Sequence, residues 1–247
     1  MKLIPKGSNK ISKVEKSLQI TNKLIKEIDS REVTLADDFR CTIPDENFQK
    51  VLIEDYNIEV VDGTVAYKDV KGIDELRCAA KSIQSLEGIE YFISLERLIC
   101  FANPISIMDI RKNSKLKTLI CWQNYWNENK LNSLDVSNNP ELEYLNVSPN
   151  DLTFLDLSNN PALTTLSCSR NQLTSLDVSN NPALEILSCS ENQLTSLDVS
   201  KNTVLAKLIC EENQLTSLDV SNNPKLKQVR LEGNPGNWWK ELEKDEE

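Results

Sequence analysis

The sequence predicts an α/β solenoid of about seven to eight short stacked coils, with a helical cap at each end. Three observations carry this prediction. Cysteines recur at intervals of 21 residues, asparagines recur at the same interval in two columns, and leucines flank both. A unit this short cannot bury its apolar face alone, but stacked units share one continuous core.

Each 21-residue unit divides into two halves. The first half reads LxxLxCxxNx, as in LTTLSCSRNQ at 163–172, and the second reads LxxLDVSxNPx, as in LTSLDVSNNPA at 173–183. A five-residue insertion lengthens one unit between Asn124 and Leu131, and a degenerate eighth unit begins near Ile73. The regular units are counted by their first leucines, Leu95, Leu116, Leu142, Leu163, Leu184, Leu205 and Leu226.

We expect a short strand in each half, in which alternate residues face opposite sides. The leucines and the Cys or Val between them then point inward, and the asparagines bond backbone groups where the chain turns. Neighbouring thiols would point the same way about 4.8 Å apart. We therefore interpret them as small core residues, which suit a reducing compartment, and not as disulfides or metal ligands. They are Cys100, Cys121, Cys168, Cys189 and Cys210.

The period of 21, the Cys of the first half and the LDVSxN of the second resemble the short bacterial leucine-rich repeats called IRREKO-type, over roughly residues 73–236. The segments IPDENFQKVLIEDY (43–56) and LEGIEYFISLERLIC (86–100) are similar to the capping region of many bacterial leucine-rich repeat proteins. In those relatives the cap often includes a calcium-loop-like stretch. Here Ile58 and Val60 replace the ligand carboxylates, and we expect no calcium binding because such a loop needs several oxygen ligands.

The ends of the solenoid need covers. At the front, apolar residues near helical spacing predict a helix over about 11–28, and a second helix at about 45–55 is expected to bury Phe48, Val51 and Leu52. At the back, a short helix is expected to place Trp238 or Trp239 over the last coil. The predicted organisation is an N-terminal helix and linker (1–42), a capping region (43–72), the solenoid (73–236), and a C-terminal cap with an acidic tail (237–247).

Charge and composition exclude several kinds of function. Residues 1–41 hold nine Lys or Arg and six Asp or Glu, a net charge of +3, so the rest carries −13 of the total of −10. An acidic body disfavours nucleic acid as a partner. The absence of histidine excludes Ser-His-Asp and Cys-His sites and imidazole-bound zinc. We expect no cofactor, no metal and no catalytic residue.

The start of the chain and its hydropathy bear on location. No apolar run approaches 18 residues, and the first residues show no apolar signal-peptide core. We therefore expect no membrane insertion and a cytoplasmic protein, with export without a cleaved leader as the alternative.

The candidate site lies on the outward side of the first-half strands. In later coils these positions are mostly small and polar, whereas early coils carry large apolar residues side by side, and the insertion NYWNEN adds two aromatics. Contiguous apolar patches mark interaction sites, and Trp and Tyr are enriched at binding hot spots. The alternative is that the N-terminal helix or the insertion covers this patch. The predicted partner-binding residues are Arg97, Ile99, Phe101, Ile120, Trp122, Tyr125, Trp126 and Tyr144.

The outward residues of the second half form a column of aspartates. We interpret them as acceptors for turn amides that keep the face soluble, with attraction of a cation or a basic partner as the alternative. They are Asp109, Asp135, Asp156, Asp177, Asp198 and Asp219.

These observations predict a non-catalytic protein–protein interaction module that binds a protein partner through the outward strand face of the N-terminal half of the solenoid. An intracellular inhibitory protein, an exported effector, and a surface or adhesion protein of the internalin-like kind all fit such a module. A self-associating structural repeat is a further alternative. An enzyme is disfavoured because the repeats and caps leave only about forty residues for a catalytic domain.

Overall fold

The computed structural model describes residues 35–123 and 130–236. The chain divides into two compact units, residues 1–36 and 37–247, and all that follows concerns the second. The predicted N-terminal helix, the insertion NYWNEN at 124–129 and the predicted C-terminal helix all lie outside the described residues.

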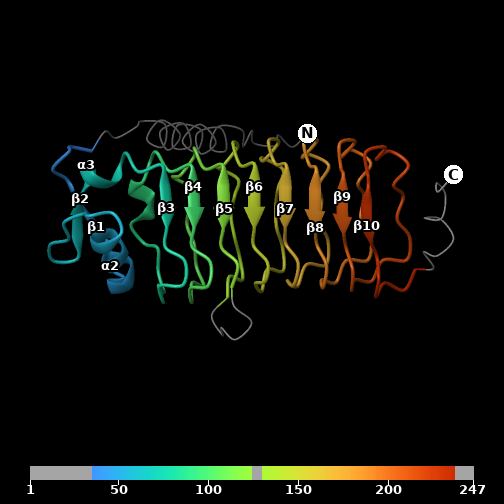
Figure 1. The fold of residues 1–247 in the computed structure, drawn as a ribbon, viewed down its shortest axis with the longest axis horizontal. Coiled ribbons are helices and arrows are strands. Elements are labelled where there is room, and N and C mark those ends of the chain that lie inside the picture. The colour runs from blue at the N-terminus through green and yellow to red at the C-terminus, as the bar shows by residue number, and fades with distance from the viewer. Residues whose placement is uncertain (1–34, 124–129, 237–247) are drawn as a thin grey trace, which may run out of the picture. The chain divides into compact units, whose positions relative to one another are not determined.

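Eight parallel strands, one from each coil, form a single sheet in chain order (Figure 1). The register joins equivalent residues of successive coils, so that Leu98 lies opposite Leu119 and Leu119 opposite Leu145. This arrangement confirms a solenoid with a degenerate coil before the seven regular ones. The strands are β3 (Glu75–Arg77), β4 (Arg97–Ile99), β5 (Thr118–Ile120), β6 (Tyr144–Asn146), β7 (Thr165–Ser167), β8 (Ile186–Ser188), β9 (Lys207–Ile209) and β10 (Gln228–Arg230).

The second halves of the coils differ from the expectation, because within the described residues they contain no regular strand. Here the amide of Ser179 bonds the side chain of Asp177 within its own coil, at 2.9 Å, and not a backbone carbonyl of the next coil. Between coils, Gln193 N donates to the carbonyl of Leu173 at 2.8 Å. The backbone groups on this side therefore form hydrogen bonds mostly within turns. Helices are few in the described part of the chain.

The core is built from the inward leucines and cysteines. Leu166 and Cys168 are fully buried, as are their equivalents in the neighbouring coils. All seven cysteines of the chain are buried and free. Burial raises the pKa of the Cys121 and Cys168 thiols to about 12, so these thiols stay protonated at neutral pH. The interpretation of the cysteine column as small apolar core residues is confirmed.

Two asparagine columns join the coils, as the sequence predicts. In the first, Asn171 Nδ2 donates to the carbonyl of Cys168 in its own coil and to that of Val147 in the coil before. In the second, Asn181 Nδ2 donates to the carbonyls of Leu157 and Asn160. The columns are Asn103, Asn150, Asn171, Asn192, Asn213 and Asn234, and Asn113, Asn139, Asn160, Asn181, Asn202 and Asn223.

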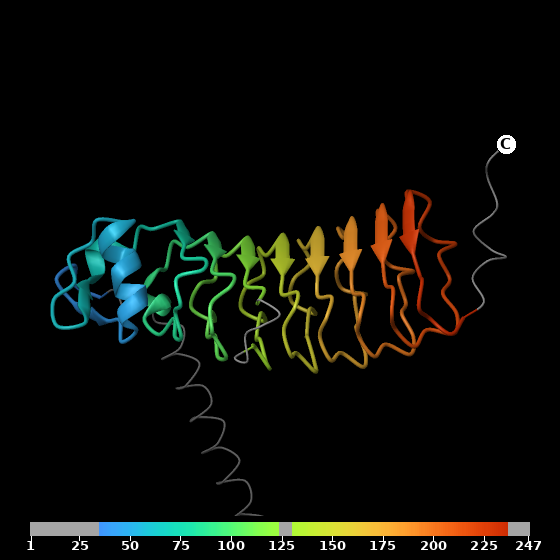
Figure 2. The same ribbon diagram turned by 60° about the horizontal axis from the view of Figure 1, so that its bottom comes forward.

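The expected second helix is present as α2 (Glu46–Glu54), which buries Phe48, Val51 and Leu52. Asp45 caps it, because one carboxylate oxygen accepts hydrogen bonds from the amides of Asn47 and Phe48. The capping region that contains α2 lies at the β3 end of the stacked coils (Figure 2).

A short strand just before position 43 pairs with the predicted capping region. Strand β1 (Arg40–Thr42) pairs antiparallel with β2 (Thr64–Ala66), and α3 (Tyr67–Val70) follows directly. A short 3₁₀ helix, η1 (Ile89–Tyr91), precedes β4. A strand of three residues is too short to show a period in the sequence, which is why β1 was not expected.

The calcium-loop-like stretch forms a tight turn. Val61 and Thr64 bridge across Asp62 and Gly63, whose φ values are 48° and 69°. Among the described residues, no group of three or more His, Cys, Asp or Glu is placed to bind a metal ion. That the calcium-loop-like stretch does not bind calcium stays a prediction.

No helix in the described part of the chain has the length and apolar character to span a membrane.

Candidate interaction site on the strand face

Phe101 and Trp122 follow β4 and β5 at equivalent positions of successive coils. Their rings stack with centroids 4.4 Å apart and planes 10° apart. The amide of Ala102 donates to the carbonyl of Trp122 at 2.8 Å, which ties the two turns together beneath the rings. The stacked pair therefore rests on a backbone that the solenoid holds in place.

The other predicted residues lie in the strands beside this pair. Ile99 lies opposite Ile120. Because Ile99 is only 8% exposed, it packs beneath the surface and offers little area for a partner to contact. Ile120, Phe101 and Trp122 are half-buried. The structure thus brings together an apolar strip of two isoleucines and two aromatic rings.

Tyr144 and Arg97 lie in a different column of the same face. Tyr144 is half-buried and faces Thr118 across β5 and β6, whereas Asn146 lies opposite Ile120. Arg97 is exposed, and its Nε donates to Glu75 Oε1 at 3.2 Å. The predicted Tyr125 and Trp126 lie outside the described residues.

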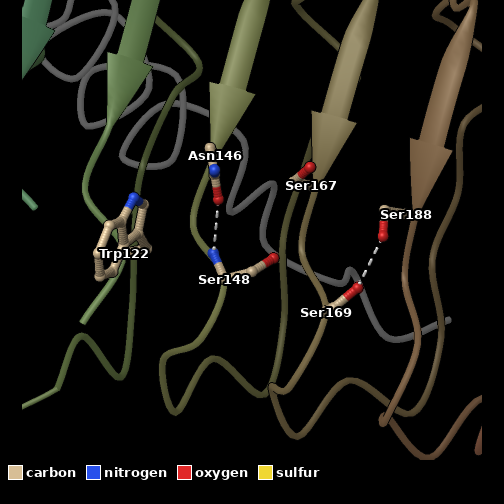
Figure 3. A pocket seen from close by; sticks show the side chains of 6 residues that line it. All are labelled: Trp122, Asn146, Ser148, Ser167, Ser169 and Ser188. Carbon is tan, nitrogen blue, oxygen red and sulfur yellow. Dashed lines mark hydrogen bonds between the residues drawn. The ribbon is translucent and has the colours of Figure 1, made fainter. Parts of the chain in front are cut away.

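A pocket of about 320 Å³ adjoins Trp122 on the side of the later coils (Figure 3). Its lining is neutral and rich in hydroxyls. Ser169 Oγ lies 3.0 Å from Ser188 Oγ, and Ser148 N donates to Asn146 Oδ1 at 3.1 Å. The sequence had suggested only that these serines are small and polar. The lining residues are Trp122, Asn146, Ser148, Ser167, Ser169 and Ser188.

Pro149 sets this coil apart from its neighbours. In five other coils the residue at this position has a positive φ and donates its amide to the next coil, as Arg170 does to the carbonyl of Ser190 at 2.8 Å. Proline has no N–H and cannot adopt a positive φ. The bond from position 149 to Ser169 is therefore missing, and the Ser148–Pro149 peptide is cis. The signal in the sequence is SPN, where the following coils read SRN and SEN.

The opposite side of the coils carries the aspartate column. Asp177 accepts from the amide of Ser179 at 2.9 Å, and the same bond recurs from Asp156 to Ser158 and from Asp198 to Ser200. The hydroxyl and the amide of the following serine lower the pKa of the Asp177 carboxyl. These contacts support the interpretation that the aspartates satisfy turn amides.

Two exposed apolar residues on that side were not singled out from the sequence. Ile107 is 78% and Phe154 65% exposed, at a column position that is serine in Ser133, Ser175 and Ser196. Phe154 adjoins a second pocket of about 470 Å³, shared with the exposed carboxylates of Asp156 and Asp177. The signal was LTFLDL in place of LTSLDV.

Comparison with known proteins places these features in context. A family model described as Leucine Rich repeats (2 copies) matches residues 161–202. No curated protein matches the chain. The functional domain of InlJ from Listeria monocytogenes, whose description includes a cysteine ladder, is 32% identical with a TM-score of 0.64. That match covers 81% of this chain and 49% of the InlJ chain, so this chain spans about half of its relative.

Two further solved structures share the fold. Internalin C2 of Listeria monocytogenes is 19% identical with a TM-score of 0.70, over 81% of this chain and 91% of that one. A leucine-rich repeat protein of Leptospira interrogans is 23% identical with a TM-score of 0.61, over 69% of this chain and 46% of that one. The buried cysteine column of this chain has the kind of arrangement for which the InlJ domain is described.

Proposed function

The chain is a leucine-rich repeat protein of the bacterial type, and on that premise we propose that it is a non-catalytic module that binds a protein partner through the strand face of its N-terminal coils. The observation that carries this proposal is the stack of Phe101 on Trp122 on the outward side of the sheet. Ile120 precedes Trp122 on the same face, and Tyr144 lies on that face in the neighbouring column, opposite Thr118; both are half-buried.

The stacked pair has the properties of a binding anchor. Aromatic side chains bring a large apolar area at a low cost in conformational entropy, and Trp and Tyr dominate measured hot spots. The ladder bonds beneath the rings are already made, so little ordering would accompany binding. The serines of later coils carry no comparable apolar area.

The described residues also favour a non-catalytic role. The thiols that an enzyme would use as nucleophiles are buried, and burial raises the pKa of Cys78 and Cys168 to about 12. The carboxylates of the aspartate column each accept a turn amide, so each has a structural role. The chain contains no histidine to serve as a general base.

The setting in which the module works has two candidates. Buried free thiols suit a cytoplasmic protein, which is the location we propose. The similarity to the InlJ domain favours the second candidate, an exported effector or a surface or adhesion protein. Fractionation of the native cells, with an antibody against the chain, separates the two.

Affinity capture tests the proposed face. The full chain is immobilised, proteins retained from source-organism and host extracts are identified, and the dissociation constant of each purified candidate is measured. We expect Trp122→Ala and Tyr144→Ala to weaken binding at least tenfold while the melting temperature stays within a few degrees. Phe154→Ala, on the opposite side, serves as the matched control.

Two results would contradict the proposal. Binding that survives both substitutions, or is lost only in Phe154→Ala, would move the interface to another surface. If both Trp122→Ala and Tyr144→Ala unfold, these two side chains belong to the core and not to a binding surface. Light scattering of the wild type against Trp122→Ala tests self-association, because a dimer through this face would dissociate.

A further inference from the structure

We propose that the hydroxyl-lined pocket beside Trp122 binds a neutral saccharide. The inference goes beyond protein binding, since it assigns a small-ligand site to the serine-rich coils that adjoin the apolar strip at Trp122. It rests on three features of the pocket: an unpartnered hydroxyl, a lining without charge, and an aromatic wall.

The unpartnered hydroxyl belongs to Ser148. Its Oγ is buried and has no hydrogen-bond partner within the described chain. Figure 3 shows this hydroxyl pointing toward the side formed by Ser169. Because the oxygen is buried, a ligand hydroxyl reaches it only when the Ser148 side chain turns toward the pocket, and that turn would give both groups a hydrogen-bond partner.

The other hydroxyls are held in place by the next coil. Ser169 Oγ accepts from the amide of Ser190 at 3.0 Å and lies 3.0 Å from Ser188 Oγ. Each serine hydroxyl offers one donor and two acceptor positions, so Ser167 and Ser188 keep capacity for a ligand. The side-chain amide of Asn146 adds two donors at the edge nearest β6.

The lining excludes charged ligands on energetic grounds. Of its six residues, four are serines, one is asparagine and one is tryptophan. A phosphate or carboxylate would find no cation there, and a lysine or arginine side chain would find no carboxylate, so either would lose hydration without compensation. A neutral ligand with several hydroxyls matches this lining.

Trp122 supplies the wall against which an apolar face of a ligand packs. Its ring is fixed because Phe101 stacks on it at 4.4 Å. A sugar ring carries C–H groups on its faces and hydroxyls around its rim, so it presents to the indole and to the serines the surface that each binds. The hollow has a volume of about 320 Å³ and is largely open to solvent, so a sugar ring could lie in it with one face against the indole.

A peptide strand is the rival occupant, and the sheet disfavours it. Peptides that bind sheets gain most from pairing their backbone with a free strand edge. Strands β6 and β7 are each paired on both sides, so no edge is available at this pocket. Only side chains point outward at this pocket, and four of its six lining residues are serines.

The experiment presents the full chain to an array of neutral, sialylated and sulfated glycans, beside a library of uncharged peptides. The best free saccharide is then titrated by saturation-transfer NMR, up to about 20 mM because single sugars bind weakly. We expect neutral glycans to bind, and Ser148→Ala and Trp122→Ala to weaken them at least tenfold. Ser175→Ala, on the opposite side, is expected to leave binding unchanged.

Pro149→Arg tests the pocket without touching its lining. It rewrites SPN as the SRN of the following coil and restores the amide that bonds position 169, so we expect the pocket to narrow and saccharide binding to be lost. Melting curves confirm that each variant folds. Absence of glycan binding, binding that survives Ser148→Ala and Pro149→Arg, or binding of peptides alone overturns the proposal.

The saccharide proposal and the protein-interface proposal can be contradicted independently of each other. Tyr144→Ala reports on the protein interface, and Ser148→Ala reports on the pocket. Loss of glycan binding in Ser148→Ala with intact protein capture supports the pocket alone. Protein capture lost in Tyr144→Ala with no glycan binding in the wild type supports the interface and overturns the pocket.

Discussion

The side chain of Asn171 accepts a hydrogen bond from the amide of Leu152, 2.9 Å away in the preceding coil. The same side chain donates to the buried carbonyls of Val147 and Cys168, so one residue completes three buried backbone groups. All of these bonds are made inside the turn, where water does not reach. The asparagines of the first column therefore join successive coils through buried hydrogen bonds.

Asn171→Ala should lower the free energy of unfolding by about 2–4 kcal/mol. The reason is that one amide and two carbonyls lose their partner in a buried turn, at roughly 1–3 kcal/mol for a buried group left unpaired. Denaturant unfolding measures the change. Asn180→Ala, at an exposed position, is the control and should cost less than about 0.5 kcal/mol. Equal losses in the two variants would contradict this role of the asparagines.

The cysteine column predicts a difference between two substitutions of similar size. Cys168→Val should change the free energy of unfolding by less than about 1.5 kcal/mol, because Val147 fills the same slot one coil earlier. Cys168→Ser should cost about 1–3 kcal/mol, since it buries a hydroxyl with no partner among leucines. Denaturant titrations compare the two. A serine variant as stable as the valine variant would show that the column tolerates polarity.

Burial of the thiols also predicts a loss of stability at alkaline pH. Cys121 has its pKa raised to about 12, from 9.0 for an exposed thiol, so the unfolded chain releases this proton first. Stability is therefore fully present below pH 9 and falls as pH rises from 9 toward 12. Each such cysteine should contribute about 1 kcal/mol of loss near pH 10. Cys121→Val should show a smaller drop between pH 8 and 10 than the wild type. Parallel pH profiles would contradict the prediction.

The sequence predicted the repeat and its register because Leu, Cys and Asn each occupy one environment in every coil. Leu166, Cys168 and Asn171 are buried where the 21-residue period places them. The 21-residue period carries no information about segments that occur only once, such as the capping region. Strand β1 has one buried residue, Cys41, between two exposed ones, which is too little for a pattern.

The candidate site was predictable to a similar degree. Phe101 and Trp122 stand out because they depart from the small residues of later coils, and the structure brings their rings together. The pocket beside them was hidden, because Ser148 and Ser167 look like the background of the repeat. What distinguishes them is Pro149, which removes one amide from the ladder, and that effect appears only when two coils are seen together. The predicted C-terminal cap stays a prediction, and the half-buried Leu226 in the last coil is consistent with the need for a cover.

Asp45 predicts how the cap is joined to the first coil. One carboxylate oxygen accepts from the amides of Asn47 and Phe48 at 2.9 Å each. The other accepts from the amides of Gln84 and Ser85, at 2.8 and 3.1 Å, in the coil that contains β3. The carboxylate thus caps α2 and binds the solenoid with the same group, and both oxygens are needed.

A pair of substitutions separates these two roles. Asp45→Ala removes all four bonds and should cost about 2–4 kcal/mol, which exceeds the ordinary effect of about 1 kcal/mol for losing a helix cap. Asp45→Asn keeps one acceptor oxygen and places an amide donor against two N–H groups, so its cost should fall between that of alanine and the wild type. Asp177→Ala, which loses one exposed turn bond, is the control and should cost less than about 1 kcal/mol. Denaturant unfolding ranks the three, and hydrogen exchange at Gln84 and Ser85 should quicken in both Asp45 variants. If exchange at these two amides stays unchanged while α2 frays, the carboxylate serves the helix alone.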